Sequence, residues 1–391
     1  MKTHPRAVTA LALAAALLAG CGGGGIGGTG SPASGTMRVS VTDAPACGYD
    51  AVNISVQKVR VHTSTAAADT DSGWSEVALS TPARIDLLTL TNGALRELGQ
   101  TELPAGRYTQ VRLVLAENSA GTPLANSVVP TGGTEVPLTT PSGSQSGIKV
   151  NMDLEVPEGK VADLVLDFDA CKSVVKRGNS GQYNLKPVVT AVPVVSDAGL
   201  RVVGYVNPAV ATPSSTHVSV QVNGVPVKST VPDPTGKFTL YPVPAGTYDL
   251  VVAASGRVTA VMTGVPVSAA APTNVNSATL AIAPPAATLR TVTGSVTPAT
   301  ANLAARQVLT GGTPVQSAWA GVDASSGAFS FTLPIEPPVK AAYVANPVSL
   351  AFTADTPVGG KYTLVAESAG VTKTQAIDVS GAVAPVSFSF P

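Results

Sequence analysis

A turn that leads into a strand recurs three times along this chain and limits the folds it can adopt. The phrase Pro-Ala-Gly-x-Tyr followed by apolar alternation occupies residues 104–115 and 244–252, and a shorter version starts at residue 360. The glycine permits a left-handed turn, and a period of two is typical of a strand with one buried face. We therefore expect one β-sandwich plan to be used three times.

A second repeat supports the same division. Residues 200–206 and 289–296 both begin Leu-Arg and continue to a Gly-x-Val phrase. Prolines and small polar residues accumulate between these units, which is typical of linkers. The predicted fold is all-β, with three consecutive Ig-like or transthyretin-like sandwiches. The predicted units are residues 37–196, 199–283 and 287–391.

The charge of the chain excludes one class of partner. Charged residues make up 12% of the chain, and the formal net charge is zero. A protein that neutralises phosphates needs a basic patch or stripe, which this composition does not supply. We expect no nucleic-acid partner.

The N-terminus predicts export from the cytoplasm. Lys2 and Arg6 precede an apolar run over residues 7–19, which is typical of a secretory signal peptide and short for a membrane span. Residues 18–21, Leu-Ala-Gly-Cys, resemble the bacterial lipobox. This resemblance implies cleavage after residue 20 and attachment of diacylglycerol and palmitate-type acyl chains to Cys21. The alternative is an ordinary signal peptide with an accidental cysteine.

The residues after the cysteine predict a tether. Residues 21–36 are rich in glycine and have little side-chain surface to bury. Position 22 is glycine, and not the aspartate that retains many Gram-negative lipoproteins in the inner membrane. We therefore expect a protein of the cell envelope that is bound to the outer membrane through its lipid.

A series of short motifs runs through the first unit, at residues 41–45, 49–52, 59–62, 73–74, 86–88, 92–93, 104–108, 146–150, 167–174 and 185–187. In these motifs, residues 37–194 resemble a bacterial lipoprotein family known as domain-of-unknown-function family 4382. The resemblance implies a fold and a location but no chemistry.

The second unit resembles the carboxypeptidase-regulatory-like modules, which are small transthyretin-type sandwiches. The matching features are Gly204-x-Val206, the strand around Phe238, and residues 244–248. Residues 287–391 resemble the same plan more faintly. The resemblance implies spacer or interaction modules, which we expect to project outward from the first domain.

Cys47 and Cys171 are the two cysteines that remain after Cys21. A pair of cysteines in an oxidising compartment tends to form a disulfide, so we expect them to be bonded. The alternative is two separate buried thiols, because a sequence does not show whether two Cα atoms lie within bridging distance.

The inventory of residues argues against catalysis and cofactors. His62 and His217 are the histidines outside the signal peptide, and they lie in different predicted units. We expect His62 at a solvated strand edge and His217 in a loop or at a strand start. No catalytic residues, no zinc site and no cofactor are predicted.

Carboxylates suggest a calcium hypothesis. Asp167 and Asp169 flank Phe168 on a predicted strand and would share one face, which Asp43 could approach. Three carboxylates would suit Ca²⁺, which prefers oxygen ligands. The alternative places Asp43 in a turn before Pro45. The pair would then be neutralised by a lysine, the candidates being Lys149, Lys172 and Lys186.

Aromatic residues suggest a sugar-binding hypothesis. Trp74, Tyr49 and Tyr108 could form a stacking platform, or they could fill the core. The best-supported interpretation is a non-enzymatic envelope lipoprotein that acts as a binding or structural module, with an envelope protein or a glycan as partner. The alternative is a calcium- or carbohydrate-binding receptor lipoprotein that uses the first domain.

Overall fold

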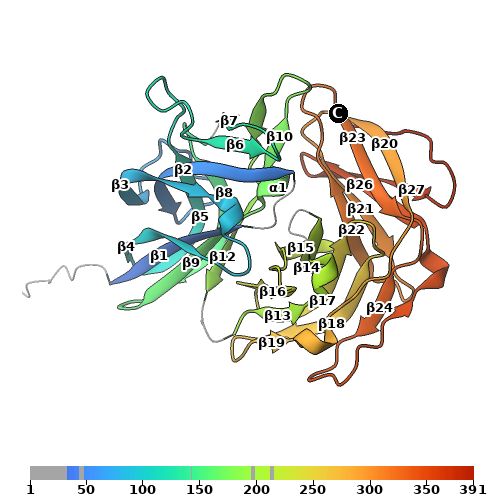
Figure 1. Cartoon of the computed structure of the whole chain (residues 1–391). Coiled ribbons are helices and arrows are strands. Elements are labelled where there is room, and N and C mark those ends of the chain that lie inside the picture. Colours follow the sequence, from blue (N-terminus) through green and yellow to red (C-terminus); the bar gives the residue numbers. More distant parts are fainter. Residues whose placement is uncertain (1–32, 44–47, 142, 195–198, 212–214) are drawn as a thin grey trace, which may run out of the picture.

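The computed structural model describes residues 33–43, 48–141, 143–194, 199–211 and 215–391. These residues form an almost entirely β structure, which confirms the predicted fold class. Buried apolar side chains gather in three main clusters, one in each predicted unit. Figure 1 shows the three sets of strands side by side. No helix in the described part of the chain is long and apolar enough to span a membrane.

The first sandwich is built from two sheets. The smaller sheet has the order β12-β9-β1-β4, and the larger has the order β10-β11-β7-β6-β2-β5-β8 with β3 paired to β2. Short helices η1 (Leu87–Thr89) and α1 (Ala170–Ser173) lie between strands. The strands are β1 (Ser34–Asp43), β2 (Tyr49–His62), β3 (Ser75–Asp86), β4 (Arg96–Pro104), β5 (Gly106–Leu115), β6 (Ser127–Pro130), β7 (Val136–Thr139), β8 (Ile148–Val156), β9 (Val161–Phe168), β10 (Val174–Lys176), β11 (Tyr183–Leu185) and β12 (Val189–Val194).

The second sandwich pairs a three-stranded sheet, β16-β13-β19, with a larger sheet that begins β15-β14-β17-β18. Its short helices are η2 (Pro208–Val210) and η3 (Ala278–Leu280). The strands are β13 (Val202–Tyr205), β14 (Thr216–Val222), β15 (Val225–Thr230), β16 (Lys237–Leu240), β17 (Gly246–Ala254), β18 (Ala260–Val267) and β19 (Thr273–Asn274).

The third sandwich repeats this plan with the sheets β23-β20-β28 and β22-β21-β26-β27. In both units the first strand pairs antiparallel with the fourth and parallel with the last. The strands are β20 (Leu289–Thr297), β21 (Asn302–Val308), β22 (Pro314–Ala320), β23 (Ala328–Pro334), β26 (Lys361–Ser368), β27 (Val371–Asp378) and β28 (Val386–Ser389).

One segment of the third unit belongs to the second sandwich. Strands β24 (Val339–Ala342) and β25 (Thr353–Ala354), which precede η4 (Thr356–Val358), extend the second sandwich's larger sheet. β24 pairs in parallel with β18, and Val339 joins the second hydrophobic core. The predicted boundary near residue 287 assigns β24 and β25 to the third unit, because no sequence repeat in residues 339–354 marks them as part of the second sandwich.

The Gly-x-Val repeat has a packing explanation. Gly204 on β13 faces Phe238 on β16, and Gly294 on β20 faces Phe329 on β23. A Cβ atom added to Gly204 would lie 2.5 Å from the ring of Phe238, and one on Gly294 would lie 2.3 Å from the ring of Phe329. A phenyl ring therefore lies across each glycine backbone and closes one end of the core.

The Pro-Ala-Gly-x-Tyr phrase forms a second shared device. In each sandwich a buried tyrosine hydroxyl donates a hydrogen bond to a proline carbonyl, which satisfies its polar end and fixes a chain corner. The third sandwich lacks the upstream proline of the phrase and uses one on β23 instead. The pairs are Tyr108 to Pro104 (3.0 Å), Tyr248 to Pro244 (2.8 Å) and Tyr362 to Pro334 (2.9 Å).

The Gly294→Ala substitution should destabilise the third sandwich by about 1–3 kcal/mol, because the added methyl would lie 2.1 Å from the Val386 carbonyl oxygen and 2.3 Å from the Phe329 ring. Urea or thermal unfolding measures the loss. Gly381→Ala is the matched control, since a Cβ atom there has open space. Equal transitions for the two variants would contradict this packing role.

Candidate functional site

The first and second sandwiches share a mixed interface. Val165, Val194, Leu200 and Tyr241 form a small apolar cluster between them. Asn92, which follows η1, adds two hydrogen bonds to the second sandwich. Its backbone N–H donates to the hydroxyl of Thr230 (2.9 Å), and its side-chain oxygen accepts from the N–H of Thr239 (3.1 Å). Both polar and apolar contacts therefore fix this junction.

The second and third sandwiches are joined by an amide clamp. The Gln221 side chain donates to the carbonyl of Gln316 (3.0 Å) and accepts from the N–H of the same residue (2.8 Å). A buried apolar cluster, formed by Val251, Val261, Leu309 and Val315, packs at the same junction.

The third sandwich also returns to the first. The N–H of Ala324 donates to the carbonyl of Lys176 (3.0 Å), and the ammonium of Lys186 donates to the side-chain oxygen of Asn302 (2.7 Å). The expectation that the later modules project outward is therefore wrong. Polar groups at the ends of the second and third sandwiches form hydrogen bonds across the junctions. Each of the three sandwiches therefore contacts the other two.

A half-open cavity of about 390 Å³ lies where the three sandwiches meet. Its walls come from α1 of the first unit, β14, β15 and β17 of the second, and β22 of the third. Figure 1 shows these elements near the centre of the molecule, where the three units approach one another. Residues His217, Ser219 and Gln221 alternate along β14, so their side chains leave the core together and face the cavity.

His217 occupies a half-buried position on this wall. Burial lowers its pKa below the ordinary value of 6.5, Asp169 opposes the shift, and Lys172 adds to it. The imidazole is therefore neutral at pH 7, with one nitrogen that donates and one that accepts. The expected strand-start position is confirmed, since His217 is the second residue of β14, but the sequence did not show that this position borders the cavity.

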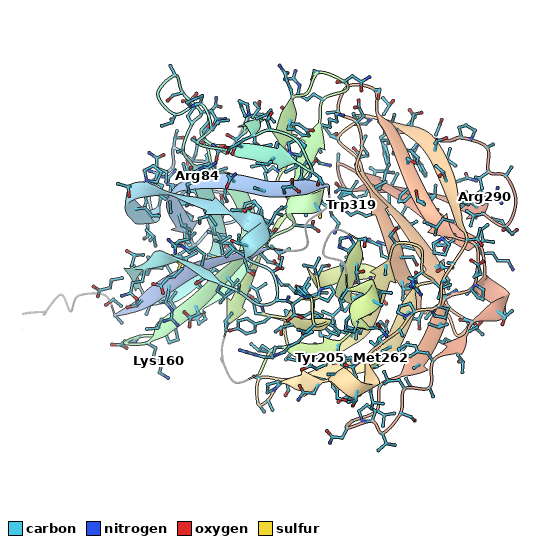
Figure 2. All side chains as sticks on the ribbon, viewed as in Figure 1. Arg84, Lys160, Tyr205, Met262, Arg290 and Trp319 are labelled. Carbon is cyan, nitrogen blue, oxygen red and sulfur yellow. The ribbon has the colours of Figure 1, made fainter. Side chains whose placement is uncertain are left out.

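Trp319 was missed by the sequence reasoning. Figure 2 shows it in the space between the first and third sandwiches, and its half-buried side chain lines the cavity. Within the described ranges its indole N–H donates to no protein group. Its rarity was an available signal, since the chain has 2 tryptophans. The long-range packing that turns residue 319 toward the first sandwich is not visible in the sequence.

The three candidate calcium ligands have separate partners. Asp167 forms a buried ion pair with Lys228 of the second sandwich, whose side chain is 2% exposed. Asp169 lies beyond the end of β9 and caps α1, where it accepts from the N–H of Lys172 (3.1 Å) and pairs with the ammonium of Lys172 (2.6 Å). The expected placement of both carboxylates on one strand face is therefore wrong, while Lys172 was among the predicted partners.

Asp43 is the third of these carboxylates and is almost fully buried. One oxygen accepts from the N–H of Ala170 (2.9 Å), and the other has no hydrogen-bond partner among the described groups. Burial raises its pKa well above the ordinary value of 3.8, and the charges of Asp169 and Asp167 add to the shift. Asp43 reaches across to α1 through this bond, while the expected turn before Pro45 lies outside the described residues.

The calcium hypothesis therefore loses its basis. Across the described ranges, no group of three His, Cys, Asp or Glu side chains is arranged to hold a metal ion. Lys149 and Lys186, the other predicted partners, donate instead to the Thr65 carbonyl (2.6 Å) and to Asn302.

The aromatic platform is also dispersed. Tyr108 is buried in the core, and Tyr49 packs edge-on against Tyr183 at 6.0 Å. Trp74 lies near His62, at the far end of β2 from Tyr49, with their ring centroids 5.1 Å apart. His62 ends β2, which lies between β3 and β5, so it is half-buried and not on the solvated strand edge that we expected. Its ring contacts the Ser72 carbonyl (3.1 Å).

The covalent predictions lie mostly outside the described residues. Cys21 and Cys47 both fall there, whereas Cys171 is buried in α1 and borders the cavity. The lipid on Cys21 and the bond between Cys47 and Cys171 therefore stay predictions.

Comparison with known proteins identifies one part of the chain. Residues 34–187 match the family described as "Domain of unknown function (DUF4382)", which confirms the predicted resemblance of the first unit. The carboxypeptidase-regulatory-like resemblance stays a prediction. No curated protein matches the sequence.

Solved structures give only distant likenesses. A type II cohesin–X-dockerin complex from Acetivibrio cellulolyticus is 24% identical over 23% of this chain and 59% of that chain, with a TM-score of 0.20. The TIE protein of Bacillus anthracis is 11% identical over 92% of this chain and 51% of that chain (TM-score 0.17). A fimbrial protein from Bacteroides ovatus is 9% identical over 73% and 54% (TM-score 0.17). The chain thus spans about three fifths or less of these proteins, and no argument rests on them.

The Lys228→Ala substitution should destabilise the protein by about 3–5 kcal/mol, because it leaves Asp167 buried without its cation. The double variant Lys228→Met with Asp167→Leu should recover most of the loss, and urea unfolding measures both. The control is Arg107→Ala, which breaks an exposed pair with Asp153 and should cause little change. A loss in the double variant as large as in Lys228→Ala would refute the role of an unpaired charge.

The raised pKa of Asp43 predicts a pH-dependent stability. Between pH 3.8 and its raised pKa, the folded state binds more protons at this group than the unfolded state. Relative to Asp43→Asn, which does not titrate, the wild type should gain stability as the pH falls from 7 toward 4. Urea unfolding of both proteins across this range measures the difference, and a difference that does not change with pH would contradict it.

Proposed function

We propose that this chain is a non-enzymatic protein of the bacterial cell envelope that acts as a binding or structural module on a lipid tether at Cys21. The observation that carries the proposal is the closure of three sandwiches around one cavity to which each of them contributes. Such a body holds loops and strand edges in fixed positions, which suits recognition of a partner or ligand.

The polar side chains around the cavity support a binding or structural role. Asp169 caps α1 and pairs with Lys172, Gln221 clamps the third sandwich, and the hydroxyl of Ser317 donates to Gln307 (3.2 Å). These bonds stabilise helix ends and junctions, so the groups contribute rigidity to the cavity wall.

The envelope location rests on the N-terminal sequence. The signal-like residues 1–20, the lipobox-like residues 18–21 and the glycine-rich residues 21–36 together describe an exported and tethered protein. Acyl chains at the N-terminal cysteine would supply stable anchoring when two or three are attached. Gly22 favours the outer membrane.

The second and third sandwiches are proposed to be modules of the carboxypeptidase-regulatory-like kind. Their common strand order, the parallel pairing of first and last strands, and the glycine beneath a phenyl ring support this assignment. Their role here would be to complete the body and the cavity.

The Cys21→Ser substitution should release the protein from the membrane fraction, because the acyl chains lose their attachment atom. Fractionation of cells followed by immunoblotting measures the distribution. Gly22→Asp is the matched control, which should keep the protein membrane-bound but shift it to the inner membrane. Tight retention of Cys21→Ser would show that another feature anchors the chain.

A further inference from the structure

We propose that the cavity between the three sandwiches binds a small saccharide of one or two rings, with the indole of Trp319 as its stacking face. This inference deepens the proposed binding role and rests on it. Its test uses the soluble body from Ser31 onward, so it does not depend on the lipid tether.

The size and position of the cavity fit such a ligand. Its volume of about 390 Å³ falls within the range of small-molecule sites, about 300–1,000 Å³. Its walls are set by β14 and β22, which belong to different sandwiches held together by the Gln221 clamp. A site between rigid strands keeps its shape before the ligand arrives, which reduces the entropy lost on binding.

The chemistry of Trp319 points to a ligand with an apolar face and polar edges. A half-buried indole leaves its face for the C–H face of a sugar ring, and its N–H remains available for a hydroxyl or ring oxygen. A fully apolar ligand would leave that N–H and the hydroxyls around it without partners, which costs free energy.

The other side chains of the cavity match a ring of hydroxyl groups. His217 is neutral and offers both a donor and an acceptor. Ser215, Ser229 and Thr259 add hydroxyls that donate and accept in the same way as those of a sugar. Arg257 contributes a guanidinium that donates only, and the charges of Asp169 and Lys172 neutralise each other. The lining therefore suits a polyhydroxylated ligand better than a metal or a lipid chain.

Trp74, the tryptophan considered for sugar binding in the first domain, has neither a ring face nor an indole N–H available to a ligand. The guanidinium carbons of Arg60 and Arg112 lie 4.6 Å and 5.2 Å from its ring centroid, and its N–H donates to the Ala68 carbonyl (2.9 Å). It therefore serves as an internal control that shares the residue type of Trp319 but not its environment.

The test exploits the fact that the chain has 2 tryptophans. In a Trp74→Phe protein all indole fluorescence comes from Trp319, and the emission is followed during titration with glucose, galactose, N-acetylglucosamine, glucuronic acid, maltose and cellobiose. We expect a saturable change with at least one of these sugars. Calorimetry with the same sugar should show an affinity about two- to tenfold weaker for Trp319→Ala than for the wild type, which is what stacking on one ring contributes. No saturable change with any sugar, or equal affinity of Trp319→Ala, would overturn the proposal.

A second variant keeps the test valid if Trp319→Ala fails to fold. Ser229→Leu fills the cavity from β15 and should abolish binding, whereas Thr374→Leu, on the exposed strand β27 that does not line the cavity, should not. Thermal unfolding checks that both are folded. Binding by a folded Ser229→Leu protein would place the sugar elsewhere and overturn the proposal. Tight membrane retention of Cys21→Ser together with intact sugar binding would refute the lipid tether and leave the cavity site standing.

Discussion

The position of the first sandwich against the second depends on one buried ion pair, between Asp167 at the end of β9 and Lys228 on β15. Two charges removed from water are stable only when they meet in good geometry, so the pair ties the relative position of two units to a short contact. The carboxyl group of Asp43 lies close to this ion pair, and its pKa is raised. This part of the interface is therefore sensitive to protonation of Asp43. Because α1 follows directly after β9, the same contact also fixes one wall of the cavity.

The internal plan of each sandwich was visible in the sequence because it depends on neighbours within one unit. The Gly-x-Val phrase predicts a strand opening, and the structure explains it through Phe238 and Phe329, which need a residue without Cβ opposite them. The Pro-Ala-Gly-x-Tyr phrase predicts a turn, and its tyrosine hydroxyls close the corner. Such local constraints leave a regular pattern because the same geometry must be met each time it is used.

The cavity could not be predicted from the sequence, because its walls come from three sandwiches whose lining residues lie far apart along the chain. His217 and Trp319 look like ordinary strand residues, and only the return of the third sandwich to the first places them around one space. The partner of Asp167 was missed for the same reason, since Lys228 belongs to another unit. The carboxylates and aromatics that seemed grouped in the sequence are separated by the sheet register and by the end of β9 at Phe168.

Strands β24 and β25 lie in the sequence of the third unit but complete the sheet of the second sandwich. Folding of the second sandwich therefore depends on residues that are synthesised after its own sequence. β18 is an inner strand of its sheet only after β24 pairs with it, and until then it presents an open edge that invites pairing with other chains. The second sandwich therefore cannot complete its sheet until residue 354 is available, well after its own sequence ends near residue 283. A truncation between the second and third units would therefore leave β18 with an unpaired edge.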